Sequence, residues 1–154
     1  MKTDQRMEAY YDEVRAENLD DPKAPPQKLL AVLNAGFVEK DQCVFLAQLK
    51  KSVQVQRPDF SNRTGYECVV NHLHMEDYLE NGGLPPLETL GRGLAFAQEL
   101  KERLSALGGL RHFRIIVACN GSTCTVRFHT LRHDEEWLDQ DVDTLFYATA
   151  VLET

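Results

Sequence analysis

The chain has 154 residues, a formal net charge of −7 at pH 7 and 43% hydrophobic residues. This apolar fraction excludes a disordered chain, and the absence of any run near ~18 apolar residues excludes a transmembrane helix. The acidic balance argues against nucleic-acid binding, which needs a basic face. The first residues, MKTDQRMEAYYDEVR, lack the apolar core of a signal peptide, so we expect a cytoplasmic location.

The negative charge is unevenly distributed along the chain. Residues 1–21 carry a net −4 and residues 22–133 a net +4. Residues 134–154 contain seven acidic residues and no Lys or Arg, which gives −7. Such asymmetry bears on the choice of partner and on association rate rather than on the fold.

The N-terminal part, residues 1–57, is predicted to be helical. Helical spacing of Met7, Tyr10 and Val14 indicates the first helix, and Asp41 is a suitable N-cap for the third. The predicted segments are helices over 4–18, 27–35 and 41–52, followed by a loop over 53–65.

The remainder, residues 66–152, alternates between strand and helix patterns. The predicted elements are a strand over 66–75, a helix over 87–107, strands over 111–119 and 123–132, a helix over 134–146 that begins at Asp134, and a strand over 147–152. This β-α-β-β-α-β succession predicts an α+β, ferredoxin-like fold, with one sheet covered by helices in a single domain over 1–154. In an alternative α+β meander, residues 147–152 would not join the sheet.

The four cysteines form neither a CxxC pair nor a zinc-ribbon pattern. Cys119 and Cys124 flank the turn sequence Asn120-Gly121-Ser-Thr. A four-residue loop would place the two cysteines opposite each other, where they could form a disulfide. A turn of Asn120-Gly121 alone would put them out of register, and a cytosolic location favours two reduced thiols.

No catalytic or cofactor motif is found, so we expect neither enzymatic activity nor a cofactor. The weak alternative is an enzyme or a metal- or ligand-binding protein that uses Cys68, His72 and His74. On a strand over 66–75 these three side chains would share one face, with Glu76 just beyond. A metal site would need further ligands there, and the simpler interpretation is a polar strand face.

The predicted helix over 134–146 is strongly acidic. Its i,i+4 pairs Glu135–Asp139 and Asp139–Asp143 repel, at a cost of roughly 0.2–0.5 kcal/mol each. One interpretation is a solvated face, and the other is a surface that binds a basic partner. Trp137 would be a core residue or an aromatic anchor at that interface. The predicted contacts are Asp134, Glu135, Glu136, Trp137, Asp139, Asp141 and Asp143.

The segments TGYECVVNHLHMEDYL (64–79) and CTVRFHTLRHDEEWLDQDVDTL (124–145) resemble small acidic bacterial toxin-immunity proteins, including those of contact-dependent growth inhibition. The resemblance implies a non-enzymatic protein that binds one cognate toxin, often a nuclease, and covers its active site with acidic groups in place of phosphates. It transfers no individual family residue. The lack of an apolar span and the acidic balance argue against a membrane or nucleic-acid partner. A further alternative is a regulatory or structural subunit that dimerises through a sheet edge.

Overall fold

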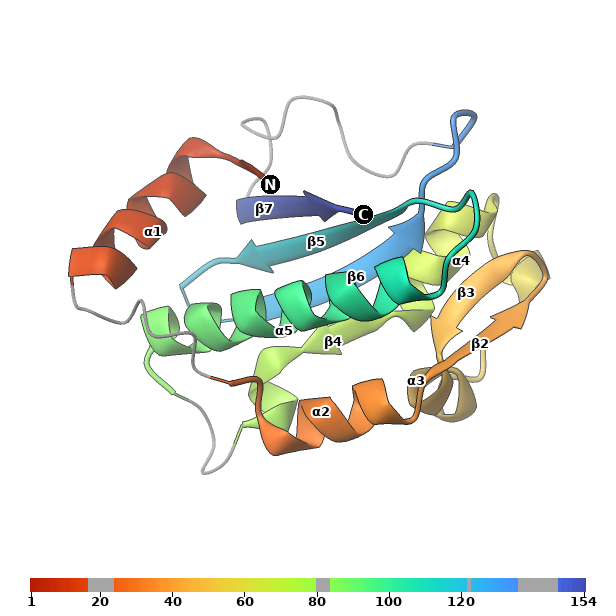
Figure 1. Cartoon of the computed structure of the whole chain (residues 1–154), viewed down its shortest axis with the longest axis horizontal. Helices are drawn as coiled ribbons and strands as arrows, with labels where there is room; N and C mark the ends of the chain where they lie inside the picture. Colours follow the sequence, from red (N-terminus) through yellow and green to blue (C-terminus); the bar gives the residue numbers. More distant parts are fainter. Residues whose placement is uncertain (17–23, 80–83, 122, 136–146) are drawn as a thin grey trace.

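The computed structural model describes residues 1–16, 24–79, 84–121, 123–135 and 147–154. Its centre is a five-stranded antiparallel sheet in the order β1-β7-β5-β6-β4. The strands are β1 (Lys2–Thr3), β4 (His72–His74), β5 (Phe113–Cys119), β6 (Cys124–Thr130) and β7 (Ala148–Glu153). The long helix α5 (Pro86–Ala106) crosses one face of this sheet (Figure 1). Among the described residues, no helix combines the length and apolarity needed to cross a membrane.

The sheet and α5 enclose the main hydrophobic core. Alternate residues of β5 and β6 point to α5, so that Val117 and Phe128 pack in one cluster with Phe96 and Leu100 of the helix. Leu46, from the N-terminal part, belongs to the same cluster. The two predicted parts of the chain, 1–57 and 66–152, therefore share one core.

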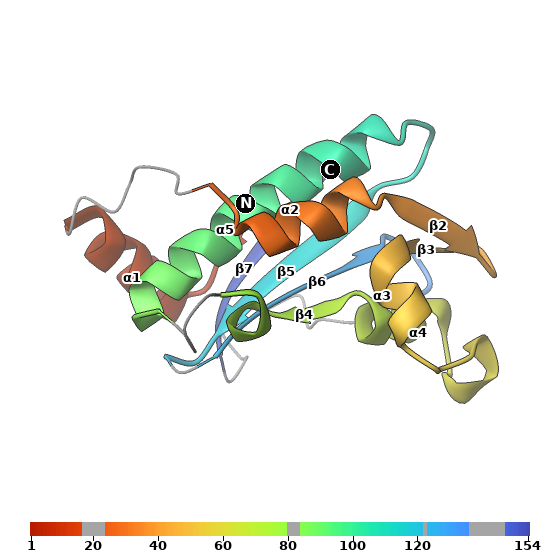
Figure 2. The same ribbon diagram turned by 90° about the horizontal axis from the view of Figure 1, so that it is seen from below.

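Two N-terminal helices form as predicted from their spacing. Helix α1 (Gln5–Ala16) and helix α2 (Gln27–Asn34) match the expected segments, while residues 17 and 18 of the first prediction lie outside the described residues. Figure 2 shows α2 beside α5, on the same side of the sheet. The buried Asp4 carboxylate accepts hydrogen bonds from the amides of Met7, at 2.7 Å, and Thr149, at 3.0 Å. This one side chain caps α1 and attaches it to β7.

The predicted helix over 41–52 is wrong in its first half. Strands β2 (Phe37–Lys40) and β3 (Cys43–Leu46) form an antiparallel hairpin, and only α3 (Ala47–Ser52) is helical. Asp41 is not an N-cap, since Asp41 and Gln42 adopt φ angles of 54° and 60° in the two-residue turn. All four side chains of β3 are buried, so the segment follows the pattern of a short buried strand.

The predicted strand over 66–75 is also largely wrong. Helix α4 (Arg63–Val70) occupies most of it, and only His72–His74 forms a strand. Helix α4 begins at Asn62, whose side-chain oxygen accepts a hydrogen bond from the Gly65 amide at 2.7 Å. Helix α4 packs against both β3 and β6, and it buries the polar Thr64 and Glu67 while Val69 is exposed, so its hydrophobic pattern does not mark its buried face.

The α+β class and the helix-covered sheet are confirmed, but the sheet differs from a ferredoxin-like one in the place of β7 and in the additional edge strand β1. Strands β4 and β5 are joined through α5 with β6 between them, which is the expected split βαβ unit. Strand β7 joins the sheet beside β5, whereas a ferredoxin-like order would place it beside β4. The meander alternative, in which 147–152 stays outside the sheet, is therefore wrong.

Candidate functional site

The buried carboxylate of Glu67 stabilises the end of the sheet next to the start of the acidic segment, residues 134–143. Glu67 of α4 is fully buried and accepts hydrogen bonds from the amides of Val44, at 2.7 Å, and Thr130, at 2.8 Å. It also accepts one from the Thr130 hydroxyl and one from Arg132, both at 2.8 Å. Both charges of the Glu67–Arg132 pair are thus buried and hydrogen-bonded, and together they join β3, α4 and β6.

Arg132 begins a short turn, and Glu135 at the end of this turn binds helix α4, the helix that carries Glu67. The Glu135 carboxylate accepts hydrogen bonds from the Thr64 amide at 2.7 Å and hydroxyl at 2.8 Å, and from Arg63 Nε at 3.1 Å. Burial raises its pKa, but the bonds from Thr64 and Arg63 outweigh that effect and lower the pKa to about 2. Glu135 therefore holds the start of the acidic segment against the N-terminus of α4.

Asp134 and Glu135, the first two predicted contact residues, differ in their exposure to solvent. Asp134 lies in the exposed turn between Arg132 and Glu135, and the helix that we expected it to cap lies outside the described residues. Only 10% of the Glu135 side chain is exposed, so its carboxylate is bound inside the chain rather than displayed to a partner. Most of the predicted helix over 134–146 lies outside the described residues, and with it lie Glu136, Trp137, Asp139, Asp141 and Asp143.

The structure does not place Cys68, His72 and His74 on one strand face, because Cys68 belongs to α4. Cys68 is fully buried, and burial raises the pKa of its thiol to about 12, which disfavours the thiolate needed for metal binding or catalysis. The two histidine rings lie 4.6 Å apart. Within the described part of the chain, no group of three His, Cys, Asp or Glu side chains could hold a metal ion.

His72 is held in its neutral form by its surroundings. Burial lowers its pKa to about 4, and the charges of Arg127 and His74 act in the same direction. The Arg127 guanidinium lies 3.1 Å from His72 Nε2 and can only donate, so this nitrogen is the acceptor. The His72–Arg127 pair is therefore better explained as a structural contact on the sheet surface than as a site of proton transfer at neutral pH.

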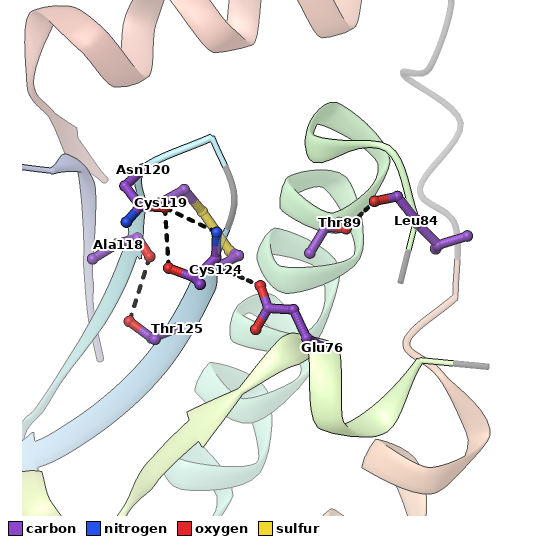
Figure 3. Close-up of a disulfide and its surroundings, with 9 residues drawn as sticks. Glu76, Leu84, Thr89, Ala118, Cys119, Asn120, Cys124 and Thr125 are labelled. Atoms are coloured by element: carbon purple, nitrogen blue, oxygen red, sulfur yellow. Dashed lines mark hydrogen bonds between the residues drawn. A yellow bond between two sulfur atoms is a disulfide. The ribbon is translucent and has the colours of Figure 1, made fainter. Parts of the chain in front are cut away.

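At the opposite end of the sheet, Cys119 and Cys124 form a disulfide across the β5–β6 hairpin (Figure 3). The loop has four residues, which is the register that allows the bond, so the expected reduced pair is not what the structure contains. The Asn120 amide donates to the Thr123 carbonyl at 3.1 Å and closes the loop. Glu76, in the 3₁₀ helix η2 (Met75–Tyr78), accepts a hydrogen bond from the Cys124 amide.

A cavity of about 250 Å³ lies beside this disulfide. Its lining comes from segments far apart in the sequence, which is why sequence reasoning did not find it. The residues around it are Tyr10, Glu76, Leu84, Pro86, Thr89, Leu90, Cys119, Gly121, Thr123 and Cys124.

One antiparallel sheet with α5 across its face, and an acidic segment fixed at the end of that sheet, define an α+β protein without a recognisable catalytic centre among the described residues. Comparison with protein-family models matches residues 2–154 to the family described as "Uncharacterized protein PM0498 family", and the chain belongs to this family. Comparisons with curated proteins and with solved structures find no match.

Proposed function

We propose that this chain is a non-enzymatic binding protein of the bacterial toxin-immunity class. In this proposal it acts in the cytoplasm and covers the active site of one basic partner, such as a nuclease, with its acidic segment, residues 134–143. The observation that carries the proposal is the charge of the last 21 residues, which include seven acidic residues and no Lys or Arg. A surface of one sign selects a partner of opposite sign and accelerates association.

The described residues at both ends of this segment support the proposal. Glu135 is attached to α4 through Thr64 and Arg63, and the chain returns in β7, which pairs with β5 at the centre of the sheet. These contacts fix the described residues on either side of the acidic segment.

Among the described acidic residues of this stretch, Asp134 lies 3.6 Å from His133, and Glu135 and Glu153 pair with arginines. Glu135 pairs with Arg63 at 3.1 Å, and Glu153 pairs with Arg114 at 2.7 Å. Because the Glu135 carboxylate is bound within the chain, we assign the contacts with the partner to five other acidic residues, with Trp137 as an aromatic anchor. Those five are Asp134, Glu136, Asp139, Asp141 and Asp143.

The thiols and imidazoles of the described residues favour binding over catalysis. Burial raises the pKa of Cys43 to about 11 and that of Cys68 to about 12, so neither is a thiolate at neutral pH. His72, with a pKa lowered to about 4, lacks the pKa near 7 that suits a general base.

Coexpression tests this function directly. A toxin and its immunity protein act as a pair, so where the gene immediately upstream encodes a large secreted protein, its C-terminal domain is the candidate toxin. We expect that domain to stop bacterial growth when expressed alone, and coexpression of this chain to restore growth. Growth arrest that persists at full expression of this chain would contradict the immunity function.

A further inference from the structure

The cavity beside the Cys119–Cys124 disulfide has the chemistry of a binding site, and the proposed function does not use it. It lies between the start of α5, the end of the β5–β6 hairpin and η2, as Figure 3 shows from the positions of Thr89, Cys124 and Glu76. At about 250 Å³ it is smaller than the ~300–1,000 Å³ of pockets for drug-sized ligands. It therefore suits a single side chain or a small molecule.

One carboxylate is fixed in the wall of this cavity. Glu76 Oε1 accepts the Cys124 amide hydrogen, which determines where the carboxylate lies. Glu76 Oε2 has no hydrogen-bond partner among the described residues and can accept one from a ligand. A donor that carries positive charge would form the strongest hydrogen bond there.

No Lys or Arg belongs to the described lining of this cavity, so nothing there neutralises Glu76. A second hollow of about 460 Å³ shares Tyr10, Pro86 and Gly121 with the cavity and adds Glu13 and Glu88. The N-terminus of α5 contributes a partial positive charge, and Glu88 in its first turn pairs with Arg92 at 3.3 Å, so Glu76 and Glu13 are the carboxylates that attract a cation here. The cavity and the adjoining hollow therefore favour cations.

The polar side chains of Tyr10, Thr89 and Thr123 form one part of the wall, and apolar groups from Leu84, Pro86, Leu90 and the disulfide form another. A cation with an alkyl chain could place its charge on Glu76 and its methylene groups against these side chains. We propose that this cavity binds an alkylammonium group, with Glu76 as its carboxylate partner. The group can belong to a free amine or to a lysine side chain of a bound protein.

The test uses n-butylammonium as the free amine, n-butanol as its uncharged analogue, and acetyl-Gly-Lys-Gly-amide as a source of a lysine side chain. Binding is followed from the backbone amide NMR signals of the full chain. We expect n-butylammonium to shift the signals of Thr89, Leu90 and Cys124, and n-butanol to bind at least about tenfold more weakly. Binding of the peptide at the same signals would identify a lysine side chain as a ligand, and binding of the amine alone would identify a small molecule.

The Glu76→Gln variant tests the role of the carboxylate. The glutamine oxygen can still accept the Cys124 amide hydrogen, so we expect the fold to persist and affinity for n-butylammonium to fall about tenfold. Glu102→Gln, on an exposed position of α5, is the matched control and should leave affinity unchanged. The proposal is overturned if neither charged probe shifts these signals. It is also overturned if n-butanol binds the original chain as tightly as n-butylammonium does, or if the Glu76→Gln variant binds n-butylammonium as tightly as the original chain does. The cavity contains no residue of the acidic segment, so this proposal and the immunity function can fail separately.

Discussion

Buried carboxylates are the residues on which this fold depends most, and Glu67 is the clearest example. Its two oxygens receive four hydrogen bonds, from Val44, Thr130 and Arg132, without contact with water. Nothing in the sequence around Glu67 indicates this, because the partners are 23 to 65 residues away. A buried charge is tolerated where its partners are all in place, and it becomes costly when one is removed.

We predict that Glu67→Ala lowers the free energy of unfolding by about 3–5 kcal/mol, because it leaves Arg132 buried without its carboxylate. Glu99→Ala is the control, since the Glu99–Arg103 pair is 31% and 41% exposed and should contribute about 1 kcal/mol or less. Urea denaturation measures both. Equal losses in the two variants would show that the Glu67 network is not a special source of stability.

Glu135 predicts a specific pH dependence of stability. Its pKa is about 2 in the folded chain and near 4.5 in the unfolded chain, so the unfolded state takes up a proton first as pH falls. The stabilisation by Glu135 is thus fully present above pH 4.5 and is lost progressively between about pH 4.5 and pH 2.

We expect the Glu135→Gln variant to lack this part of the pH dependence. Its deficit in free energy of unfolding relative to the original chain should be larger at pH 7 than at pH 3. Denaturation with urea at the two pH values measures the deficit. A deficit independent of pH would mean that the Glu135 carboxylate is not stabilised in its charged form.

At the scale of elements, sequence periodicity succeeded where one face of an element is buried and failed where nearly all of it is. The amphipathic stripe predicted α5, and Asn120-Gly121 predicted the β5–β6 hairpin. All four side chains of β3 are buried, and α4 buries the polar Thr64 and Glu67, so in neither segment does the hydrophobic pattern separate helix from strand. The position of β7 depends on pairing between distant segments, which local patterns do not encode.

The N-cap of α4 offers a test of the element that the sequence analysis missed. Asn62→Ala removes the hydrogen bond to the Gly65 amide and should lower the free energy of unfolding by about 1 kcal/mol. Asn62→Asp keeps an oxygen acceptor and should leave stability nearly unchanged. If the two variants had the same stability in urea denaturation, Asn62 would not cap a helix at this position.

At the scale of the whole molecule, the net charge of −7 separates into residues 1–133, whose charges sum to zero, and an acidic C-terminal segment. The sequence was sufficient to find this segment, because charge can be counted without knowing the fold. The sequence could not show that the Glu135 carboxylate is bound within the chain, because its hydrogen-bond partners Arg63 and Thr64 are 72 and 71 residues away. The cavity beside the disulfide was hidden for the same reason, because α1, η2 and the hairpin meet only in the folded chain.

The most direct test of the proposed function is the binding rate of the upstream-encoded toxin domain at low and high salt. The variant combines Asp139→Lys with Asp143→Lys, and the control reverses two exposed carboxylates elsewhere, Asp12→Lys with Glu102→Lys. We predict that the variant associates about 10- to 100-fold more slowly than the control at low salt, and that the difference shrinks as salt screens the charges. Equal association rates and equal salt dependence in the two proteins would contradict binding through the acidic segment.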